Sequence, residues 1–334
     1  MRVSNLLKTG VYRGLHWVEG HAASLWLRYA REKPGLNVFM FHRIDAEAAP
    51  PESHEIMPHQ ETTVQHFREF IACMTDAGYS FVRPQDLPAC RKSPGHYAMI
   101  TFDDGYFDVL RALPVLEEFN VPAVFFISTR FVLEQKAFWT DVLYRQLMRQ
   151  AVGPARLGDT FAEFNRLPTP VIEQRLEEQF GTGCLRPLGE VDRTLTAGEL
   201  ARFAQHPLVV IGNHTANHAV LTLYPESEIA NEIALAQKHL REITGRLPDS
   251  IAYPGGQCNA RIVELARSAG LQFGFTGVSG RWSERDLREG DFMTIPRIAL
   301  AGSRSIERQC LLARANIQIY QKLKGNSSGS NYPS

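Results

Sequence analysis

The chain has 334 residues, of which 44% are apolar and 22% charged, so it can bury the large core of a globular protein. Its 36 Lys and Arg residues balance 36 Asp and Glu residues, and without a basic surplus we expect no nucleic acid among its partners. The five cysteines are odd in number and form no C-x-x-C pair, which argues against a disulfide framework and against a zinc ribbon.

Residues 1–36 have the pattern of an amphipathic helical segment with a basic polar face. Apolar residues recur there at steps of three and four, at Leu7, Val11, Leu15, Val18, Ala22, Leu25 and Tyr29. Such a helix can lie on an anionic membrane surface, or it can pack on its own domain or on a second subunit. Neither a membrane-spanning run nor the apolar core of a secretion signal is present. We therefore expect a cytoplasmic location, with residues 1–35 as the candidate peripheral contact with a membrane.

Seven short apolar runs predict strands, and helical patterns fall between several of them. The predicted strands are Val38–Phe41, Ala98–Phe102, Ala123–Ile127, Val209–Ile211, Ser250–Tyr253, Phe273–Thr276 and Thr294–Leu300. The predicted helices are Thr63–Ala77, Asp108–Phe119, Glu226–Thr244 and Arg261–Ala269. Strands that alternate with helices favour an α/β fold with a parallel sheet, either open or closed into a barrel.

Residues 37–304 are expected to form one domain, which a helical insertion interrupts at about 131–204. The insertion shows no obvious chemistry, and its predicted helices are Trp139–Arg149, Pro170–Phe180 and Ala197–Ala204. Residues 305–334 predict a C-terminal helix and a disordered tail, because the last ten residues are rich in Gly, Ser and Asn.

Polar side chains follow several of the predicted strands at the point where each strand ends. His42 follows the first strand, Asp103 and Asp104 follow the second, and His214 follows the fourth. The turn Pro254-Gly255-Gly256 follows the fifth strand, and Arg297 lies within the seventh. Because the active site of a parallel α/β barrel forms at the carboxyl ends of its strands, we expect these residues to converge there.

Two of these segments together suggest a catalytic metal centre. Two imidazoles four residues apart, His214 and His218, can share a helix face and one metal ion, and an aspartate would complete a three-ligand site. Such a site leaves positions open for water and substrate, and the second aspartate is then free to act as a base. Each motif alone could also be a surface turn or a loop with solvated histidines, but their pairing at one rim favours the metal site.

These motifs resemble those of the polysaccharide deacetylase family, also known as carbohydrate esterase family 4 or the NodB-homology domain. Thr101–Gly105 is similar to its first motif, and His214–His218 to its second, H-[ST]-x-x-H. The resemblance implies a distorted (β/α)7 barrel, here with a helical insertion. It also implies that Asp103 is the general base and that Asp104, His214 and His218 bind a divalent cation, with zinc as the expected ion.

The resemblance further implies how the substrate would be held. A backbone N–H near Tyr106 would donate to the oxyanion, together with the metal. The third motif, Ile251–Gly256, would place Tyr253, Pro254 and Gly255 beside the substrate, although Tyr253 could instead simply pack in the core.

The sequence departs from the family pattern at two positions. The third motif usually carries an arginine two residues before its proline, where this chain has Ala252, and no acid histidine occurs in 295–300. The segment Val38–Ile44 resembles the first strand of permuted members that act on bacterial exopolysaccharides, in which that strand supplies the acid. We therefore expect His42 to be the general acid and Arg297 to hold Asp103. The alternatives are a packed or surface histidine and an ion pair of Arg297 elsewhere.

The function expected from these residues is metal-dependent removal of an acetyl or similar small acyl group from an amino sugar. The substrate would be an N-acetylated bacterial polysaccharide or its nucleotide-linked or lipid-linked precursor. The alternatives are an amidohydrolase or O-deacetylase that acts on another substrate with the same centre, and an inactive carbohydrate-binding relative.

Overall fold

The computed structural model describes residues 32–46, 56–57, 62–300 and 305–315. The predicted N-terminal amphipathic segment up to residue 31 and the predicted tail lie outside these residues. Among the described residues, no helix combines the length and the apolar character needed to cross a membrane.

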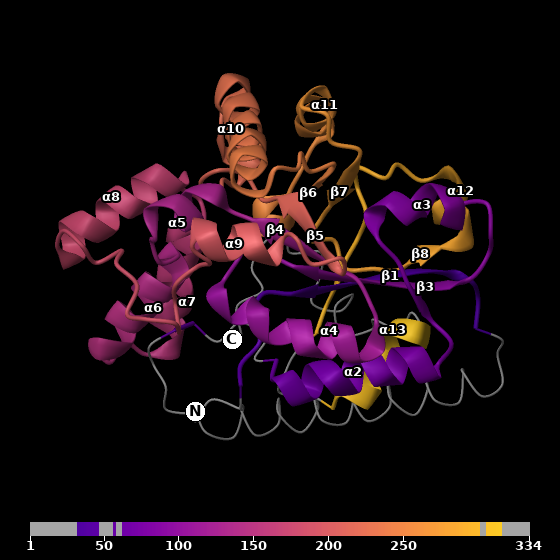
Figure 1. Cartoon of the computed structure of the whole chain (residues 1–334). Helices are drawn as coiled ribbons and strands as arrows, with labels where there is room; N and C mark the ends of the chain where they lie inside the picture. Colours follow the sequence, from indigo (N-terminus) through magenta and orange to yellow (C-terminus); the bar gives the residue numbers. More distant parts are fainter. Residues whose placement is uncertain (1–31, 47–55, 58–61, 301–304, 316–334) are drawn as a thin grey trace.

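A curled, mostly parallel sheet forms the centre of the molecule (Figure 1). Its strands run in the order β7-β6-β5-β4-β3-β1-β8, with β2 beside β3 and β9 beside β1, and only β8 is antiparallel to its neighbour. The strands are β1 (Gly35–Phe41), β2 (Ser80–Phe81), β3 (His96–Phe102), β4 (Ala123–Ile127), β5 (Val209–Asn213), β6 (Ser250–Ala252), β7 (Phe273–Phe275), β8 (Trp282–Ser283) and β9 (Ile298–Ala299). The α/β class is confirmed, and the first six predicted strands correspond to β1, β3, β4, β5, β6 and β7, whereas β2 and β8 were not predicted.

The seventh predicted strand, Thr294–Leu300, is shorter than expected, and it curls the sheet back on itself. Its first half bridges to β7 through Ile295, whereas its second half, β9, pairs with β1. Pro296 stands between the halves and has no N–H to donate, so the segment changes neighbours there instead of continuing one ladder. The result is a distorted barrel, as the sequence predicted.

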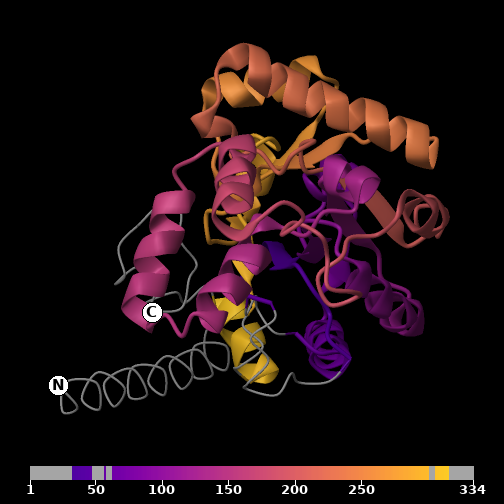
Figure 2. The same ribbon diagram turned by 90° about the vertical axis from the view of Figure 1, so that its left-hand side faces the viewer.

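Helices cover both sides of the sheet, α10 and α11 on one side and α2, α4 and α13 on the other (Figures 1 and 2). Their bounds are α2 (Val64–Asp76), α3 (Leu87–Cys90), α4 (Leu113–Phe119), α10 (Glu226–Thr244), α11 (Ala260–Ser268), α12 (Glu284–Glu289) and α13 (Ile306–Ala315). The predicted helix Asp108–Phe119 is split into the 3-10 helix η2 (Phe107–Ala112) and α4, because Pro114 cannot donate into a preceding turn and instead opens a new helix.

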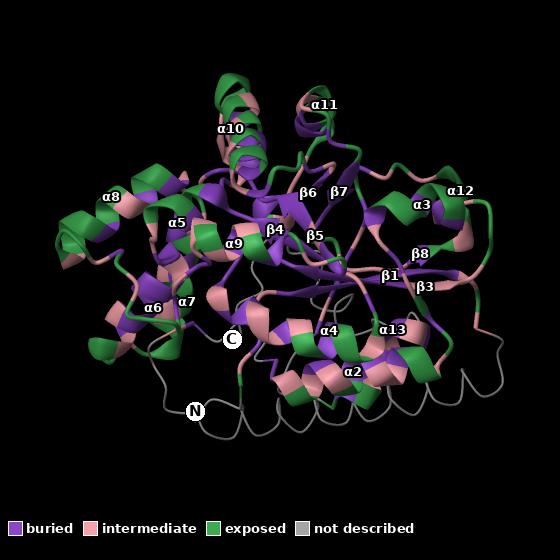
Figure 3. Cartoon of the chain, viewed as in Figure 1, coloured by how far each residue is buried: buried purple, intermediate pink, exposed green. Residues whose placement is uncertain are grey.

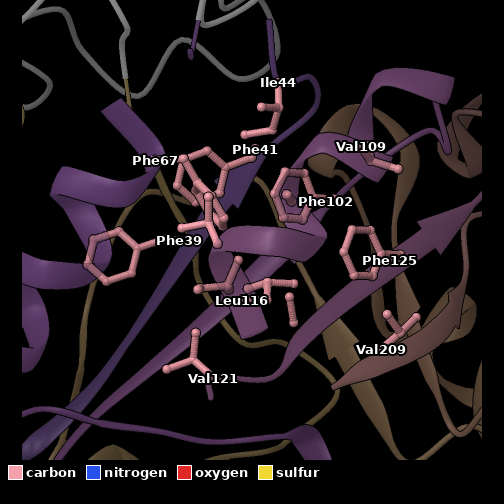
Figure 4. Packing of buried hydrophobic residues seen from close by; sticks show 14 of the residues in the cluster. Phe39, Phe41, Ile44, Phe67, Phe102, Val109, Leu116, Val121, Phe125 and Val209 are labelled. Carbon is pink, nitrogen blue, oxygen red and sulfur yellow. The ribbon is translucent and has the colours of Figure 1, made fainter. Parts of the chain in front are cut away.

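The central strands are largely buried (Figure 3), and aromatic side chains fill the core beside them (Figure 4). The ring of Phe102 stacks on that of Phe125 with centroids 4.9 Å apart, and Phe41 packs against both Phe67 and Phe102. Burial of a large apolar side chain contributes about 1.5–3 kcal/mol. This packing therefore makes a rigid platform of the strand ends that carry the polar residues.

The insertion between β4 and β5 comprises α5 (Thr129–Glu134), α6 (Trp139–Arg149), α7 (Pro154–Phe164), α8 (Thr169–Phe180) and α9 (Ala197–Phe203), of which α5 and α7 were not predicted. Within the insertion, α6, α7 and α8 lie together at one end of the sheet, whereas α9 packs on the main core (Figure 1). The insertion's own apolar cluster includes Trp139, Phe161 and Leu176.

Candidate metal centre

The predicted ligands Asp104, His214 and His218 lie together at the carboxyl ends of β3 and β5. Oδ1 of Asp104 is 3.4 Å from Nε2 of His214 and 3.3 Å from Nε2 of His218, and the candidate ligand atoms all lie within 4.8 Å of one another. Asp104 and His214 are buried, whereas the side chain of His218 is 21% exposed. The centre is thus open to solvent on the side of His218.

The donor set fits a divalent cation. Nδ1 of His214 lies 2.8 Å from the carbonyl oxygen of Ala252, and since a carbonyl can only accept, this nitrogen carries the proton. In the neutral ring Nε2 then presents a lone pair to Asp104, whose buried Oδ1 accepts no hydrogen bond from the described residues. Lone pairs that converge in this way suit a divalent cation, and the Ala252 carbonyl orients the imidazole as an outer-shell partner does in metal sites.

Left-handed backbone conformations shape both motifs. Asp104 has φ 76° and is followed by Gly105 at φ 86°, while Thr215 and His218 have φ 61° and 51°. The segment between the two histidines is not helical, so the predicted shared helix face is wrong, and a tight loop brings the rings together instead. Non-glycine residues in this region store about 1–3 kcal/mol each, a cost that occurs mainly at functional sites.

Hydrogen bonds hold the histidine loop in this conformation. The side chain of Asn213 accepts from the N–H of Thr215 at 2.8 Å, and the Thr215 hydroxyl accepts from the N–H of Ala219 at 2.8 Å. Asn217 donates from its backbone and its side chain to the buried Glu232 of α10. Strand β5, helix α10 and the loop itself thereby hold the two rings in place.

Asp103 is held by the arginine that the sequence nominated. Both terminal nitrogens of Arg297 bond to the two carboxylate oxygens at 2.7 Å, and its Nε donates to the carbonyl of Thr276 at 3.1 Å. Both side chains are nearly fully buried. Arg297, from the segment just before β9, therefore holds Asp103, as expected from the sequence.

The electrostatics of the centre favour ionised carboxylates. Burial acts to raise the pKa of Asp103, but Arg297 and His214 outweigh it and hold the pKa below its ordinary value. Burial opposes ionisation of Asp104 as well, yet His218 and His214 hold its pKa below the ordinary value. Burial lowers the pKa of His218 to about 4, so this ring is neutral at pH 7 and can donate a lone pair.

His42 directly follows β1, and its imidazole lies near enough to the two aspartates to affect their pKa values. It contributes to the low pKa of both Asp103 and Asp104. His42 is half-buried, so the structure places it at the edge of the centre, on the strand next to the one that carries the aspartates.

The residues predicted to contact the substrate differ in their position and burial. Tyr106 is buried next to the aspartates, whereas Tyr253 lies in the core, where its hydroxyl donates to the carbonyl of Met293 at 3.0 Å. The Tyr253 side chain is therefore a packing residue, in line with the second of the two expectations. Pro254 is buried, and Gly255 is exposed with φ 66° in the turn after β6.

A buried network that the sequence did not reveal joins the centre to the insertion. Nε of Arg43 lies 2.9 Å from Asp108, and its terminal nitrogen lies 3.8 Å from Asp141 of α6, whose carboxylate also accepts from the hydroxyl of Tyr106 at 2.9 Å. Burial raises the pKa of Asp108 to about 6, and burial raises the pKa of Asp141 as well. The only sequence feature that could have indicated this network is Arg43, a charged residue shortly after an apolar strand.

Two other residues of the insertion touch the histidine loop. The ring of Phe138 meets that of His218 edge to face with centroids 5.5 Å apart, and the Thr169 hydroxyl donates to the carbonyl of His218 at 3.3 Å. The insertion, in which the sequence shows no obvious chemistry, therefore forms one wall of the centre.

Comparisons with known proteins agree with the motifs. The family model described as polysaccharide deacetylase matches residues 91–274, more than half of the chain. The matched range includes the aspartates and the histidine loop, but His42 and Arg297 lie outside it. No curated protein matches the sequence significantly.

Solved structures share the fold at low sequence identity. The Streptococcus pyogenes deacetylase PplD in complex with acetate has a TM-score of 0.57 at 17% identity, with 83% of this chain and 96% of that chain covered. IcaB from Ammonifex degensii gives 0.57 at 21% identity, covering 85% and 98%. The BpsB deacetylase domain from Bordetella bronchiseptica gives 0.53 at 18%, covering 80% and 96%.

Proposed function

Because this chain belongs to the polysaccharide deacetylase family, we propose that it removes acetyl groups from the amino sugars of an N-acetylated glycan in a metal-dependent reaction. The family places it among the hydrolases that act on carbon–nitrogen bonds other than peptide bonds. The observation that carries the proposal is the cluster of Asp104, His214 and His218 next to an aspartate that an arginine holds ionised.

In this proposal Asp104, His214 and His218 hold the cation, with zinc as the ion that two imidazoles and a carboxylate suit. When bound, a divalent ion supplies Lewis acidity, which makes water nucleophilic near neutral pH and polarises the acyl carbonyl. Every other part of the reaction falls to side chains and backbone groups of the chain itself.

Asp103 takes the proton of the attacking water, and Arg297 keeps the carboxylate ionised and oriented for this task. As the water oxygen bonds to the carbonyl carbon, the backbone N–H of Tyr106 donates to the oxyanion. His42 then protonates the nitrogen as the carbon–nitrogen bond breaks, because an amine anion is a very poor leaving group. The products are acetate and the free amino sugar.

We propose a bacterial surface polysaccharide, or a nucleotide-linked or lipid-linked precursor of one, as the substrate. The shared fold with IcaB and the BpsB deacetylase domain supports this class. A cytoplasmic or membrane-surface location would suit a precursor better than a finished polymer.

The test is acetate release from a panel of N-acetylated glycans, O-acetylated glycans and acetylated sugar nucleotides, with the zinc-loaded protein and with Asp103→Asn as the blank. We expect release from at least one N-acetylated glycan or sugar nucleotide, and its loss on chelation and recovery with zinc. Release from O-acetylated glycans alone would replace the proposal by an O-deacetylase. Equal release by Asp103→Asn and the unmodified chain would refute the assigned mechanism.

A further inference from the structure

The carboxylate of Asp141, in the first turn of α6, joins three separate segments of the chain. Its Oδ1 accepts from the backbone N–H of Met57, in the connection between β1 and α2, at 3.0 Å. Its Oδ2 accepts from the Tyr106 hydroxyl at 2.9 Å and lies 3.8 Å from Arg43. Asp141 has no exposed surface. A buried carboxylate with this many donors fixes the positions of the groups around it.

The carbonyl, the hydroxyl and the ring of Tyr106 all make contacts with neighbouring residues. Its carbonyl accepts from the N–H of Val109 at 3.4 Å, its hydroxyl binds Asp141, and the Arg43 guanidinium lies 4.5 Å from the centre of its ring. The ring also packs against that of Phe138 with centroids 4.9 Å apart. The residue as a whole is 1% exposed.

The backbone N–H of Tyr106 is the exception. It makes no hydrogen bond to any of the described residues, although the flanking Gly105 and Phe107 both pair with the 193–195 segment. Buried N–H groups in folded proteins nearly always have a partner. An unsatisfied N–H two residues after Asp104 is therefore suited to donate a hydrogen bond to a substrate oxygen.

We propose that Asp141, supplied by the helical insertion, is a positioning residue for the hydrolytic step. It acts through the hydroxyl of Tyr106, which it holds so that the N–H of Tyr106 meets the oxyanion. This inference rests on the proposed function, and it assigns to the insertion a part in catalysis as well as in packing.

The experiment compares two buried tyrosines that each donate to a carboxylate. Tyr106→Phe removes the hydroxyl that binds Asp141, and Tyr79→Phe removes a hydroxyl that binds Glu32 and accepts from Asn37, near the opposite end of β1. Each change deletes one oxygen atom from a tyrosine at most 5% exposed, so the variants are matched in kind. Asp141→Asn and the double variant Tyr106→Phe/Asp141→Asn complete the set.

The probe is 4-nitrophenyl acetate, whose good leaving group needs the base and the oxyanion donor but no acid. We expect kcat to fall about 10–100-fold in Tyr106→Phe and in Asp141→Asn, with KM changed less than about twofold, since a misplaced reacting group costs on the order of 100-fold. The double variant should be no worse than the worse single variant, because the two groups form one contact. Zinc content should stay intact, and Tyr79→Phe should change only the urea midpoint.

Each other outcome overturns the inference in a distinguishable way. If Tyr106→Phe and Asp141→Asn lose stability but keep kcat, as Tyr79→Phe does, Asp141 is a structural residue only. If their zinc content falls in step with kcat, Asp141 supports the metal centre instead of the oxyanion donor. If the unmodified chain is no faster than Asp103→Asn, the proposed function itself fails, and the inference fails with it.

Discussion

Replacement of Arg297 by methionine tests whether the buried charges of Arg297 and Asp103 stabilise each other. The two side chains are 1% and 5% exposed and meet through two bonds of 2.7 Å. Arg297→Met keeps an apolar stem of similar length but leaves the carboxylate buried without its cation. Asp103→Asn has the converse effect and leaves the guanidinium without an anion.

The expected losses in the free energy of unfolding follow from the desolvation of each charge. Loss of one partner of a buried pair costs about 3–5 kcal/mol, whereas an uncharged pair of similar volume is often neutral or stabilising. If the two single changes acted independently, the double variant Arg297→Met/Asp103→Asn would lose about 6–10 kcal/mol. We expect it instead to lose less than either single variant, because no uncompensated charge remains.

The assay is urea unfolding of the zinc-loaded proteins, followed by tryptophan fluorescence. The control is the surface pair Arg68–Glu118, whose side chains are 38% and 46% exposed and meet at 2.9 Å. There Arg68→Met and Glu118→Gln should each cost less than about 1 kcal/mol and should add in the double variant. Additive losses for Arg297 and Asp103 as well would refute the argument that their charges stabilise each other.

Three further changes probe other parts of the centre. His42→Ala should slow an N-acetyl sugar substrate about 100-fold or more and leave 4-nitrophenyl acetate nearly unaffected, and equal effects on both substrates would remove His42 as the acid. Gly105→Ala should lower the free energy of unfolding by more than about 1 kcal/mol, because Gly105 has a φ of 86° and the new Cβ would lie 3.0 Å from the Ile127 side chain. The measurement is urea unfolding, and an unchanged urea midpoint would contradict this. Thr215→Val should weaken zinc binding about 10–100-fold while Thr215→Ser retains it, because only a hydroxyl can accept from the N–H of Ala219. Equal zinc affinities of the two variants in a chelator competition would exclude a role of this hydroxyl in shaping the histidine loop.

Local signals in the sequence were enough for the elements that frame the site. The strand Ala123–Ile127 has the predicted bounds, because an uninterrupted run of buried apolar residues defines it. The helix Glu226–Thr244 also ends where predicted, since Gly245 adopts the left-handed conformation that stops it. The pairing of Asp103 with Arg297, across 194 residues, followed from the family resemblance, because the third motif of this chain lacks the usual arginine.

The network behind the centre could not be found in this way. In the sequence Asp108 and Asp141 are ordinary acids in the first turns of predicted helices, where a favourable interaction with the helix dipole explains them fully. What sets them apart is that both approach Arg43, and for Asp141 this depends on how the insertion docks on the barrel. Tertiary contacts of this kind have no periodicity or spacing that a single sequence displays.

The two histidines of the second motif lie close together as expected, but not through the geometry that their spacing suggested. Histidines at i and i+4 suit a helix, yet here Thr215 and His218 are left-handed and the loop between the rings has no helical bonds to support it. Its support comes from the intervening side chains, since Thr215 bonds within the loop and Asn217 ties it to Glu232. A strained loop held from several sides sets the distance between the rings before any ion binds. The residues between the two histidines therefore determine the metal site as much as the histidines themselves.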